Sequence, residues 1–445
     1  MFEQMEILTN DYSLPMLSAN GSNTYIVIIV SVCIIFTFLV RIRRSISTPQ
    51  NLSGRSGMML LSSPTVANGL SKVIEKVKQQ FDVPSIHATF EENISGTVGE
   101  GDSKLSLNFI NPEAPIGSRE SFIQNDRCWR IASVTKSFTA TLLLQLVELG
   151  IVPPMDTAID RWIPETQYYK TSKITLAMLA NMTSGLADYE EIITGNYKNM
   201  LRSWTPEELI ELSMNQPPLF EPGTAWHYSN SGYIILGVIM CYEAKEPSLD
   251  TLMQRYILKP FGLHHTKLIE GKEAIDGAID DPHIKGYADI GDGNGVKDVT
   301  YQGVSWGWAA GSIISTSEDM HRWARIFGTG AAFDNHCTEM SSDKILASPS
   351  CSPLLSNSAT RYFSPFKRTF FYGYALIQDN GWIYHNGDIP GWGTVVAYHP
   401  ANQLSVVLVC NKTTSKELEK QFKHNSVNEL LKRCVEVLTP EDVIH

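Results

Sequence analysis

An apolar stretch of the chain opens with Ser133-Val134-Thr135-Lys136 and continues to Gly150. Apolar residues recur in it at helical spacing, which predicts a buried helix over residues 133–150. A serine and a lysine three residues apart lie on one face of such a helix, one turn from each other. Lys136 can then take the hydroxyl proton of Ser133, provided that its surroundings lower its pKa, and so make the serine a nucleophile.

Two other Ser-x-x-Lys tetrapeptides begin at Ser341 and Ser364, so the spacing alone does not identify the nucleophile. Ser341 lies in a polar stretch, and Ser364 precedes a proline in an aromatic, basic run. Neither tetrapeptide opens an apolar helical pattern. The choice of Ser133 therefore depends on further motifs along the chain.

Two such motifs follow. Tyr228 and Asn230 form a Tyr-x-Asn motif that is preceded by Pro-Gly and followed by Ser-Gly-Tyr. The chain has two other Tyr-x-Asn tripeptides, but neither carries these flanking residues. The second motif is His385-Asn386-Gly387, the chain's only His-x-Gly, on a predicted strand before a glycine turn.

The three motifs, in this order, resemble those of serine β-lactamase-like hydrolases. This group includes class C β-lactamases, low-molecular-weight penicillin-binding peptidases, D-aminopeptidases and related carboxylesterases. Residues 174–186 and 309–320 resemble further blocks of the same family, although Asn181 stands where the family usually has a histidine. The resemblance covers about residues 69–412, and five ordered blocks make a chance match very improbable.

The resemblance implies an α/β (α+β) fold of the β-lactamase/transpeptidase type. Such a fold has a mixed antiparallel sheet flanked by helices and an all-helical lobe, with the active site between them. The residue patterns agree with this expectation. They predict strands within 84–110 and 371–411, mostly helices over 133–263, and a closing amphipathic helix over 417–438.

The resemblance also implies roles for the site residues. Ser133 is the expected nucleophile, and Lys136 and Tyr228 are both candidate bases between which the sequence does not choose. Asn230 is expected to offer its amide to Lys136 or to the substrate carbonyl. His385, in place of the lysine of Lys-Thr-Gly, is expected to bond Tyr228 or to orient the substrate.

The family pattern places an oxyanion hole at the backbone N–H groups of Ser133 and Asp388. A carboxylate at Asp388 departs from that pattern, and we expect it to disfavour anionic substrates such as classical β-lactams. Gly387 is expected to let the substrate approach the strand closely. The expected acyl transfer needs neither a metal ion nor an organic cofactor.

Composition narrows the possible partners. The 445 residues carry a net charge of −11, and no basic patch with interleaved aromatic residues is present, so nucleic acid is not an expected partner. The chain has seven cysteines and no Cys/His cluster with zinc-ligand spacing. The expected partners are small-molecule, peptide or ester substrates.

The N-terminal region predicts a membrane anchor. Residues 1–22 form a polar tail, residues 23–40 an apolar helix long enough to span a bilayer, residues 41–68 a flexible linker, and residues 69–440 the catalytic domain. Contact with the lipid bilayer is expected through residues 24–40. Three arginines follow the span and no basic residue precedes it, so the positive-inside rule favours a cytosolic catalytic domain. Five glycosylation sequons point weakly to the opposite side.

These observations predict a membrane-anchored serine hydrolase that acts on amide, peptide or ester substrates. An acyltransferase of the same fold is the alternative among enzymes. A non-catalytic, scaffolding protein with this fold is the alternative outside them.

Overall fold

The computed structural model describes residues 60–92, 103–110, 127–333, 360–363, 369–413 and 425–444. All of them belong to one compact unit. Among these residues, no helix is both long enough and apolar enough to cross a membrane. The expected membrane-spanning helix at residues 23–40 lies outside the described residues.

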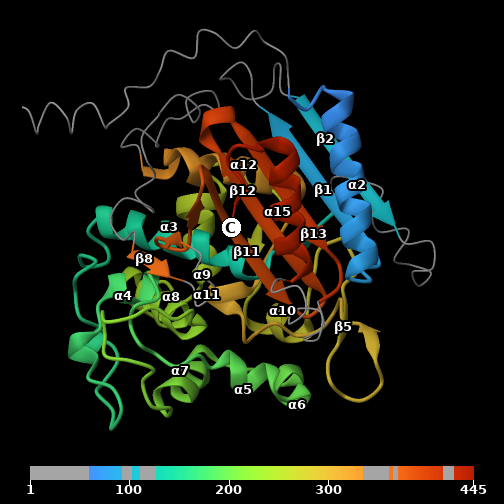
Figure 1. Ribbon diagram of the computed structural model, residues 1–445. Helices are drawn as coiled ribbons and strands as arrows, with labels where there is room; N and C mark the ends of the chain where they lie inside the picture. Colours follow the sequence, from blue (N-terminus) through green and yellow to red (C-terminus); the bar gives the residue numbers. More distant parts are fainter. Residues whose placement is uncertain are drawn as a thin grey trace, which may run out of the picture. The chain divides into compact units, whose positions relative to one another are not determined.

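An eight-stranded sheet forms the centre of this unit (Figure 1), in the order β2-β1-β13-β12-β11-β10-β9-β8. The strands are β1 (Ser85–Glu92), β2 (Ser103–Ile110), β8 (Thr360–Phe363), β9 (Thr369–Tyr372), β10 (Ile377–Asp379), β11 (Trp382–Ile389), β12 (Trp392–His399) and β13 (Leu404–Cys410). Every pairing within this sheet is antiparallel, so the expectation of a mixed sheet was wrong in this respect. The β1–β13 pair joins the two ends of the domain and encloses the helical segments between them.

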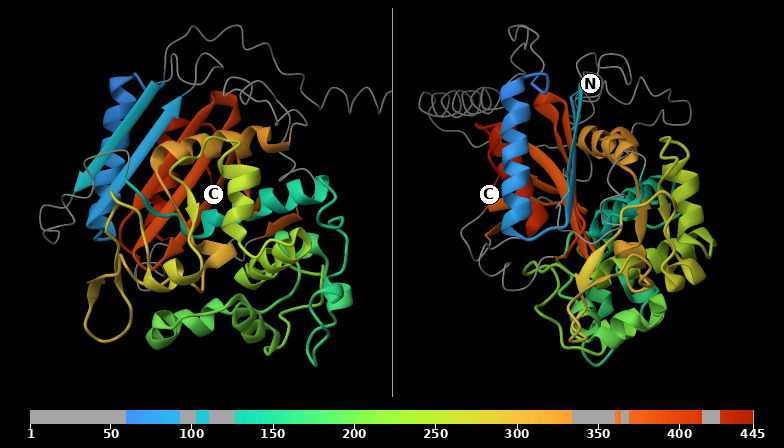
Figure 2. Two further views of the ribbon diagram at one scale, coloured as in Figure 1. Left: turned by 180° about the vertical axis from the view of Figure 1, so that it is seen from behind. Right: turned by 90° about the vertical axis from the view of Figure 1, so that its right-hand side faces the viewer.

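Two helices cover one face of the sheet (Figure 2). They are α2 (Pro64–Gln80) and α15 (Ser426–Leu438), and their apolar faces pack on strand residues such as Phe90 and Val406. The helix α2 begins inside the stretch predicted as linker, because Pro64 suits the first turn of a helix. Leu61 also joins this core. The predicted linker over 41–68 therefore extended too far into the domain.

The helical lobe lies on the other side of the sheet. Its helices are α3 (Thr135–Glu148), α4 (Leu176–Ala180), α5 (Glu190–Thr194), α6 (Tyr197–Leu201), α7 (Pro206–Met214), α8 (Asn230–Ala244), α9 (Leu249–Met253), α10 (Gly271–Asp276) and α11 (Trp308–Gly311). The helix α12 (Ser317–Thr329) packs directly on β12 and β13. Two short sheets complete the unit: β3 (Trp129–Arg130), β7 (Ile313–Ser315) and β4 (Lys267–Leu268) in the first, and β5 (Tyr287–Asp289) and β6 (Val296–Asp298) in the second.

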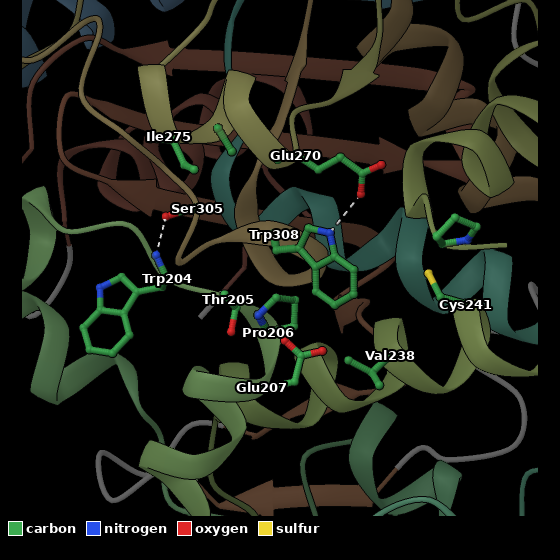
Figure 3. Close-up of a pocket in the computed structure, with 13 residues that line it drawn as sticks. Trp204, Thr205, Pro206, Glu207, Val238, Cys241, Glu270, Ile275, Ser305 and Trp308 are labelled. Carbon is green, nitrogen blue, oxygen red and sulfur yellow. Dashed lines mark hydrogen bonds between the residues drawn. The ribbon is translucent and has the colours of Figure 1, made fainter.

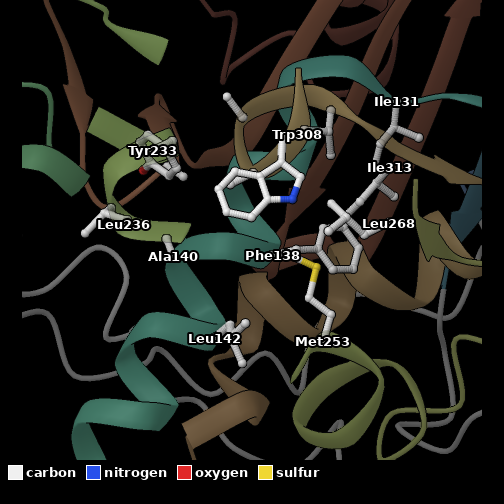
Figure 4. Packing of buried hydrophobic residues seen from close by; sticks show 14 of the residues in the cluster. Ile131, Phe138, Ala140, Leu142, Tyr233, Leu236, Met253, Leu268, Trp308 and Ile313 are labelled. Atoms are coloured by element: carbon white, nitrogen blue, oxygen red, sulfur yellow. The ribbon is translucent and has the colours of Figure 1, made fainter. Parts of the chain in front are cut away.

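The core of the lobe fixes α3, the helix that carries Lys136 (Figure 4). Phe138 of α3 stacks on Trp323 of α12, with ring centroids 3.9 Å apart. Figure 4 shows Phe138 packed beside Met253, Leu268 and Trp308. Because all of these residues are buried, the apolar face of α3 is enclosed and the helix is held rigidly against its neighbours.

Candidate active site

Ser133 lies in a 3₁₀ turn, Ala132–Val134, that leads directly into α3. The predicted helix thus begins as a tighter turn and ends at Glu148 rather than Gly150. Ala132 and Val134 are fully buried, whereas Ser133 remains partly exposed. The turn therefore presents one polar side chain between two buried apolar ones, at the positive end of the α3 dipole.

The strand β11 lies against this turn, and Gly387 makes that approach possible. A Cβ at position 387 would lie 2.8 Å from the backbone nitrogen of Ser133 and 2.9 Å from Cβ of Ala132, and it would clash with the carbonyl oxygen of Ile131. Glycine is required here by the protein's own backbone. This requirement is separate from the close approach of substrate that the sequence suggested.

Lys136 is completely buried, and its amine has three hydrogen-bond partners. Nζ lies 2.9 Å from Oγ of Ser133, 2.6 Å from Oδ1 of Asn230 and 2.8 Å from the carbonyl oxygen of Ala310. The two carbonyl oxygens can only accept hydrogen bonds. A neutral amine therefore donates its two N–H groups to them, and its lone pair faces the hydroxyl of Ser133.

Burial also changes the charge of this amine. It lowers the pKa of Lys136 to about 7, although the negative charges of Glu190 and then Asp188 act in the opposite direction. A substantial fraction of Lys136 is thus neutral near pH 7. The first condition set by the sequence, a lysine with a lowered pKa, is met by desolvation.

Tyr228 is half-buried and its hydroxyl group is hydrogen-bonded to Ser133. Its ring centroid lies 4.9 Å from Nζ of Lys136. Burial first, and then the nearby Tyr372, raise the pKa of Tyr228 well above its usual value. The phenol is therefore neutral, and of the two candidate bases only Lys136 has a pKa close to neutrality.

Asn230, the first residue of α8, has its amide oriented by two carboxylates. Its Oδ1 accepts from Lys136, while Nδ2 donates to Asp188 at 2.9 Å and also to Glu190. The backbone N–H of Asn230 donates to the same oxygen of Asp188 at 3.1 Å. The amide of Asn230 is thus fully engaged within the protein, and the expected bond to the substrate carbonyl is not available in this arrangement.

Sequence reasoning missed Asp188 and Glu190. Burial raises the pKa of both carboxyl groups, and that of Glu190 reaches about 7 because the neighbouring Asp188 adds to the effect of burial. A usable signal was present, since Asp188 and Glu190 lie two and four residues after the apolar end of the recognised 174–186 block. Acidic residues in a buried segment are rare unless they have partners.

His385 is buried on β11 and is bonded to Tyr372 rather than to Tyr228. Its Nδ1–H donates to the carbonyl oxygen of Asn386, so its Nε2, 3.2 Å from the hydroxyl of Tyr372, is the acceptor of that hydroxyl. Burial, and then the charge of Lys136, lower the pKa of His385 to about 3. His385 is therefore neutral and supplies no charge to the site.

Asp388 lies on the opposite face of β11 from Gly387, because side chains alternate along a strand. Its carboxylate accepts a hydrogen bond of 2.7 Å from Nδ2 of Asn425, at the start of α15. The structure therefore places this carboxylate away from the Ser133 face, and its effect on anionic substrates stays a prediction. The role of the backbone N–H of Asp388 in an oxyanion hole stays a prediction.

The described residues contain no cluster of potential metal ligands. Over the described ranges, no three His, Cys, Asp or Glu side chains lie close enough together to hold a metal ion.

A family model and similar proteins point to the same family. The beta-lactamase family model matches residues 118–425. Penicillin-binding protein 4* of Bacillus subtilis is 25% identical over 312 residues, which make up 67% of this chain and 63% of that protein. The unguisins hydrolase ungD of Aspergillus violaceofuscus is 25% identical over 63% of this chain and 52% of its own length. The chain thus spans less than two thirds of either relative.

Solved structures show the same fold. The D-amino acid amidase of Ochrobactrum anthropi, solved in complex with L-phenylalanine amide, has a TM-score of 0.65 at 23% identity, covering 84% of this chain and 99% of that one. The octameric penicillin-binding protein homologue of Pyrococcus abyssi has a TM-score of 0.59 at 21% identity, covering 83% of this chain and 80% of that one.

Proposed function

Because this chain belongs to the beta-lactamase family, whose relatives of this fold are serine hydrolases, we propose that it forms an acyl-enzyme through Ser133 on amide, peptide or ester substrates. The observation that carries the proposal is the environment of Lys136. Its two carbonyl partners orient the amine lone pair toward Ser133, and its pKa of about 7 leaves that lone pair free at neutral pH.

The proposed cycle has two steps. In the first, Lys136 takes the proton of Ser133 as Oγ bonds to the substrate carbonyl carbon. The backbone N–H groups of Ser133 and Asp388 stabilise the oxyanion. The bond to the leaving group then breaks, and the leaving group takes a proton through the hydroxyl of Tyr228. In the second step, water attacks the acyl-enzyme by the same route in reverse and releases the acid.

A covalent probe tests the nucleophile. After incubation with a fluorophosphonate, trypsin should cut after Arg130 and Lys136 and release a six-residue peptide whose only serine is Ser133. We expect the label on this peptide in the wild type and in Ser364→Ala, a matched control from another Ser-x-x-Lys tetrapeptide. We expect no label in Ser133→Ala. Labelling of Ser133→Ala at the same rate would refute the assignment, as would a folded wild type that neither labels nor hydrolyses activated esters.

The charges around the site support a substrate class. His385 is neutral and the carboxylate of Asp388 bonds to Asn425, whereas the negative charges of Asp188 and Glu190 act on both Lys136 and Tyr228. Both acidic side chains remain partly exposed. We propose that substrates with an ammonium group near the scissile carbonyl are favoured over those with a carboxylate there.

A substrate series tests this preference. Leucine p-nitroanilide, its N-acetyl derivative and its N-succinyl derivative differ in charge next to the same leaving group, and both enantiomers should be assayed. We expect kcat/KM to fall by roughly fivefold or more at each step from ammonium to neutral to carboxylate. A faster reaction with the succinyl compound would contradict the preference while leaving the acyl-enzyme proposal intact.

The N-terminal region supports a further part of the proposal, a single membrane anchor at residues 23–40 ahead of the domain. The apolar span is followed by three arginines that suit the cytosolic membrane surface. We expect the full chain to remain in the membrane fraction after alkaline carbonate extraction, and Ile34→Arg, which puts a charge in the span, to release it. Release of the wild type by carbonate would contradict the anchor.

A further inference from the structure

A cavity of about 530 Å³ opens in the helical lobe (Figure 3). Its described lining residues include none of those proposed for catalysis. The walls come from α7, α8, α10 and from Trp308 at the start of α11. This volume falls within the range of about 300–1,000 Å³ that is typical of pockets for small organic ligands.

The pocket has an apolar wall that is held rigidly. The indole N–H of Trp308 donates to Oε2 of Glu270 at 3.1 Å, which fixes the ring in its plane. The ring also packs on Gly237, where an added Cβ would lie 2.8 Å from Cζ3 of Trp308. Val238 and Ile275 extend the apolar surface on either side. A flat hydrocarbon group can therefore pack against this wall.

The pocket carries acidic charge. The carboxylate of Glu270 is already satisfied, because it accepts from Trp308, from Oγ of Ser248 at 2.5 Å and from the backbone N–H of Leu249 at 3.3 Å. Glu207 is exposed, and its carboxylate makes no hydrogen bond or ion pair with any described residue. It stands in the first turn of α7, at the positive end of the helix dipole. Figure 3 shows its side chain below the indole of Trp308.

The described lining of the pocket holds no positive side chain that would offset the negative charge of Glu207. Lysine, arginine and histidine are absent from its described lining residues. Arg202, which stacks on Trp204 at 3.8 Å, is paired with Glu208. Burial, and then the charges of Glu270 and Glu246, raise the pKa of the Cys241 thiol to about 12, so the thiol stays protonated. Among the described lining residues, the free charge that faces the cavity is therefore negative.

We propose that this pocket binds a small organic cation with an apolar body, such as an arylalkylamine. The ammonium group pairs with Glu207, and the aromatic or alkyl part packs on Trp308. Binding here is independent of the proposed hydrolysis, because the site shares no side chain with Ser133, Lys136 or Tyr228. It would add a second ligand site to the helical lobe.

Calorimetric titration of the full chain with 4-phenylbutylamine and with its uncharged analogue 4-phenylbutanol tests this proposal. We expect the wild type to bind the amine about tenfold more tightly than the alcohol, because one partly solvated charge pair separates the two ligands. Glu207→Gln should remove this preference and leave the affinity for the alcohol unchanged. Glu211→Gln, one turn further along the exposed side of α7, is the matched control and should behave as the wild type.

The variant Ile275→Trp tests whether the ligand lies in this pocket, because the larger side chain fills the cavity. Ile275 is 49% exposed, so the substitution does not disturb the core. This variant should bind neither ligand. Equal affinity of the wild type for amine and alcohol, no saturable binding, or an amine preference that survives Glu207→Gln would each overturn the proposal. Unimpaired amine binding by folded Ile275→Trp would do so too, since it would place the ligand elsewhere.

Discussion

The charge on Glu190 should set the pH at which the enzyme becomes active. If Lys136 must be neutral to accept the proton of Ser133, kcat/KM rises with pH through the pKa of Lys136, which is about 7. The negative charge of Glu190 raises that pKa. In Glu190→Gln the charge is absent and the amide can still accept from Asn230. The pKa of Lys136 then falls, and the acid limb of the profile moves to lower pH.

The size of the shift follows from the geometry. One amide, that of Asn230, joins Nζ of Lys136 to the carboxylate of Glu190 through two hydrogen bonds, which places the charges roughly 6 Å apart. At an effective dielectric constant of about 20, the Coulomb energy is about 2.8 kcal/mol, or about two pKa units. The pKa of Glu190 is itself about 7, so it is only about half ionised where Lys136 titrates. We therefore expect a shift of about one unit.

A neutral ester, p-nitrophenyl acetate, is the appropriate substrate for this measurement because the substituted residue cannot attract or repel it. kcat/KM would be measured from pH 5 to 9 for the wild type, Glu190→Gln and the control Glu191→Gln, whose side chain is exposed. The control should match the wild type within about 0.2 units. A midpoint for Glu190→Gln that is unchanged, or that moves to higher pH, would refute Lys136 as the group whose neutral form is required.

Three other outcomes are expected. Burial lowers the pKa of His321 to about 4 from 6.5, so the stability that the neutral histidine gives above pH 6.5 is lost as the pH falls toward 4. Between pH 7 and 5, the free energy of unfolding of the wild type should therefore fall by about 2 kcal/mol more than that of His321→Gln. Urea unfolding measures this difference. Gly387→Ala should reduce kcat/KM for esters by about a hundredfold, because its Cβ would push β11 away from the backbone nitrogen of Ser133. Asp388→Ala should keep kcat/KM within about twofold while lowering the free energy of unfolding by about 1 kcal/mol, since its side chain bonds to Asn425.

Each of these outcomes has a clear contrary result. Equal acid sensitivity of the wild type and His321→Gln would mean that this histidine is not held neutral in the fold. Full activity of Gly387→Ala would mean that the strand can move without cost to the site. A large loss of activity in folded Asp388→Ala would mean that its carboxylate acts at the Ser133 face.

The order of the motifs and the class of fold follow from the amino-acid sequence alone. Ser133 and Lys136 are three residues apart where a 3₁₀ turn runs into α3, so local geometry alone places them within reach of each other. Strand-like alternation and helical periodicity likewise depend on neighbouring residues. The helix α7 illustrates this point, because its capping box joins Thr205 and Glu208, which are only three residues apart.

The chemistry around those motifs depends instead on tertiary packing. One partner of Lys136 is Asn230, 94 residues away, and a partner of the Asp388 carboxylate is Asn425, 37 residues away. Hydrogen bonds over such separations depend on how strands and helices pack, which no local pattern encodes. Burial decides the rest, since the loss of water lowers the pKa of Lys136 and leaves His385 neutral. The sequence thus named the reactive groups, and the packing around them set their charges and their partners.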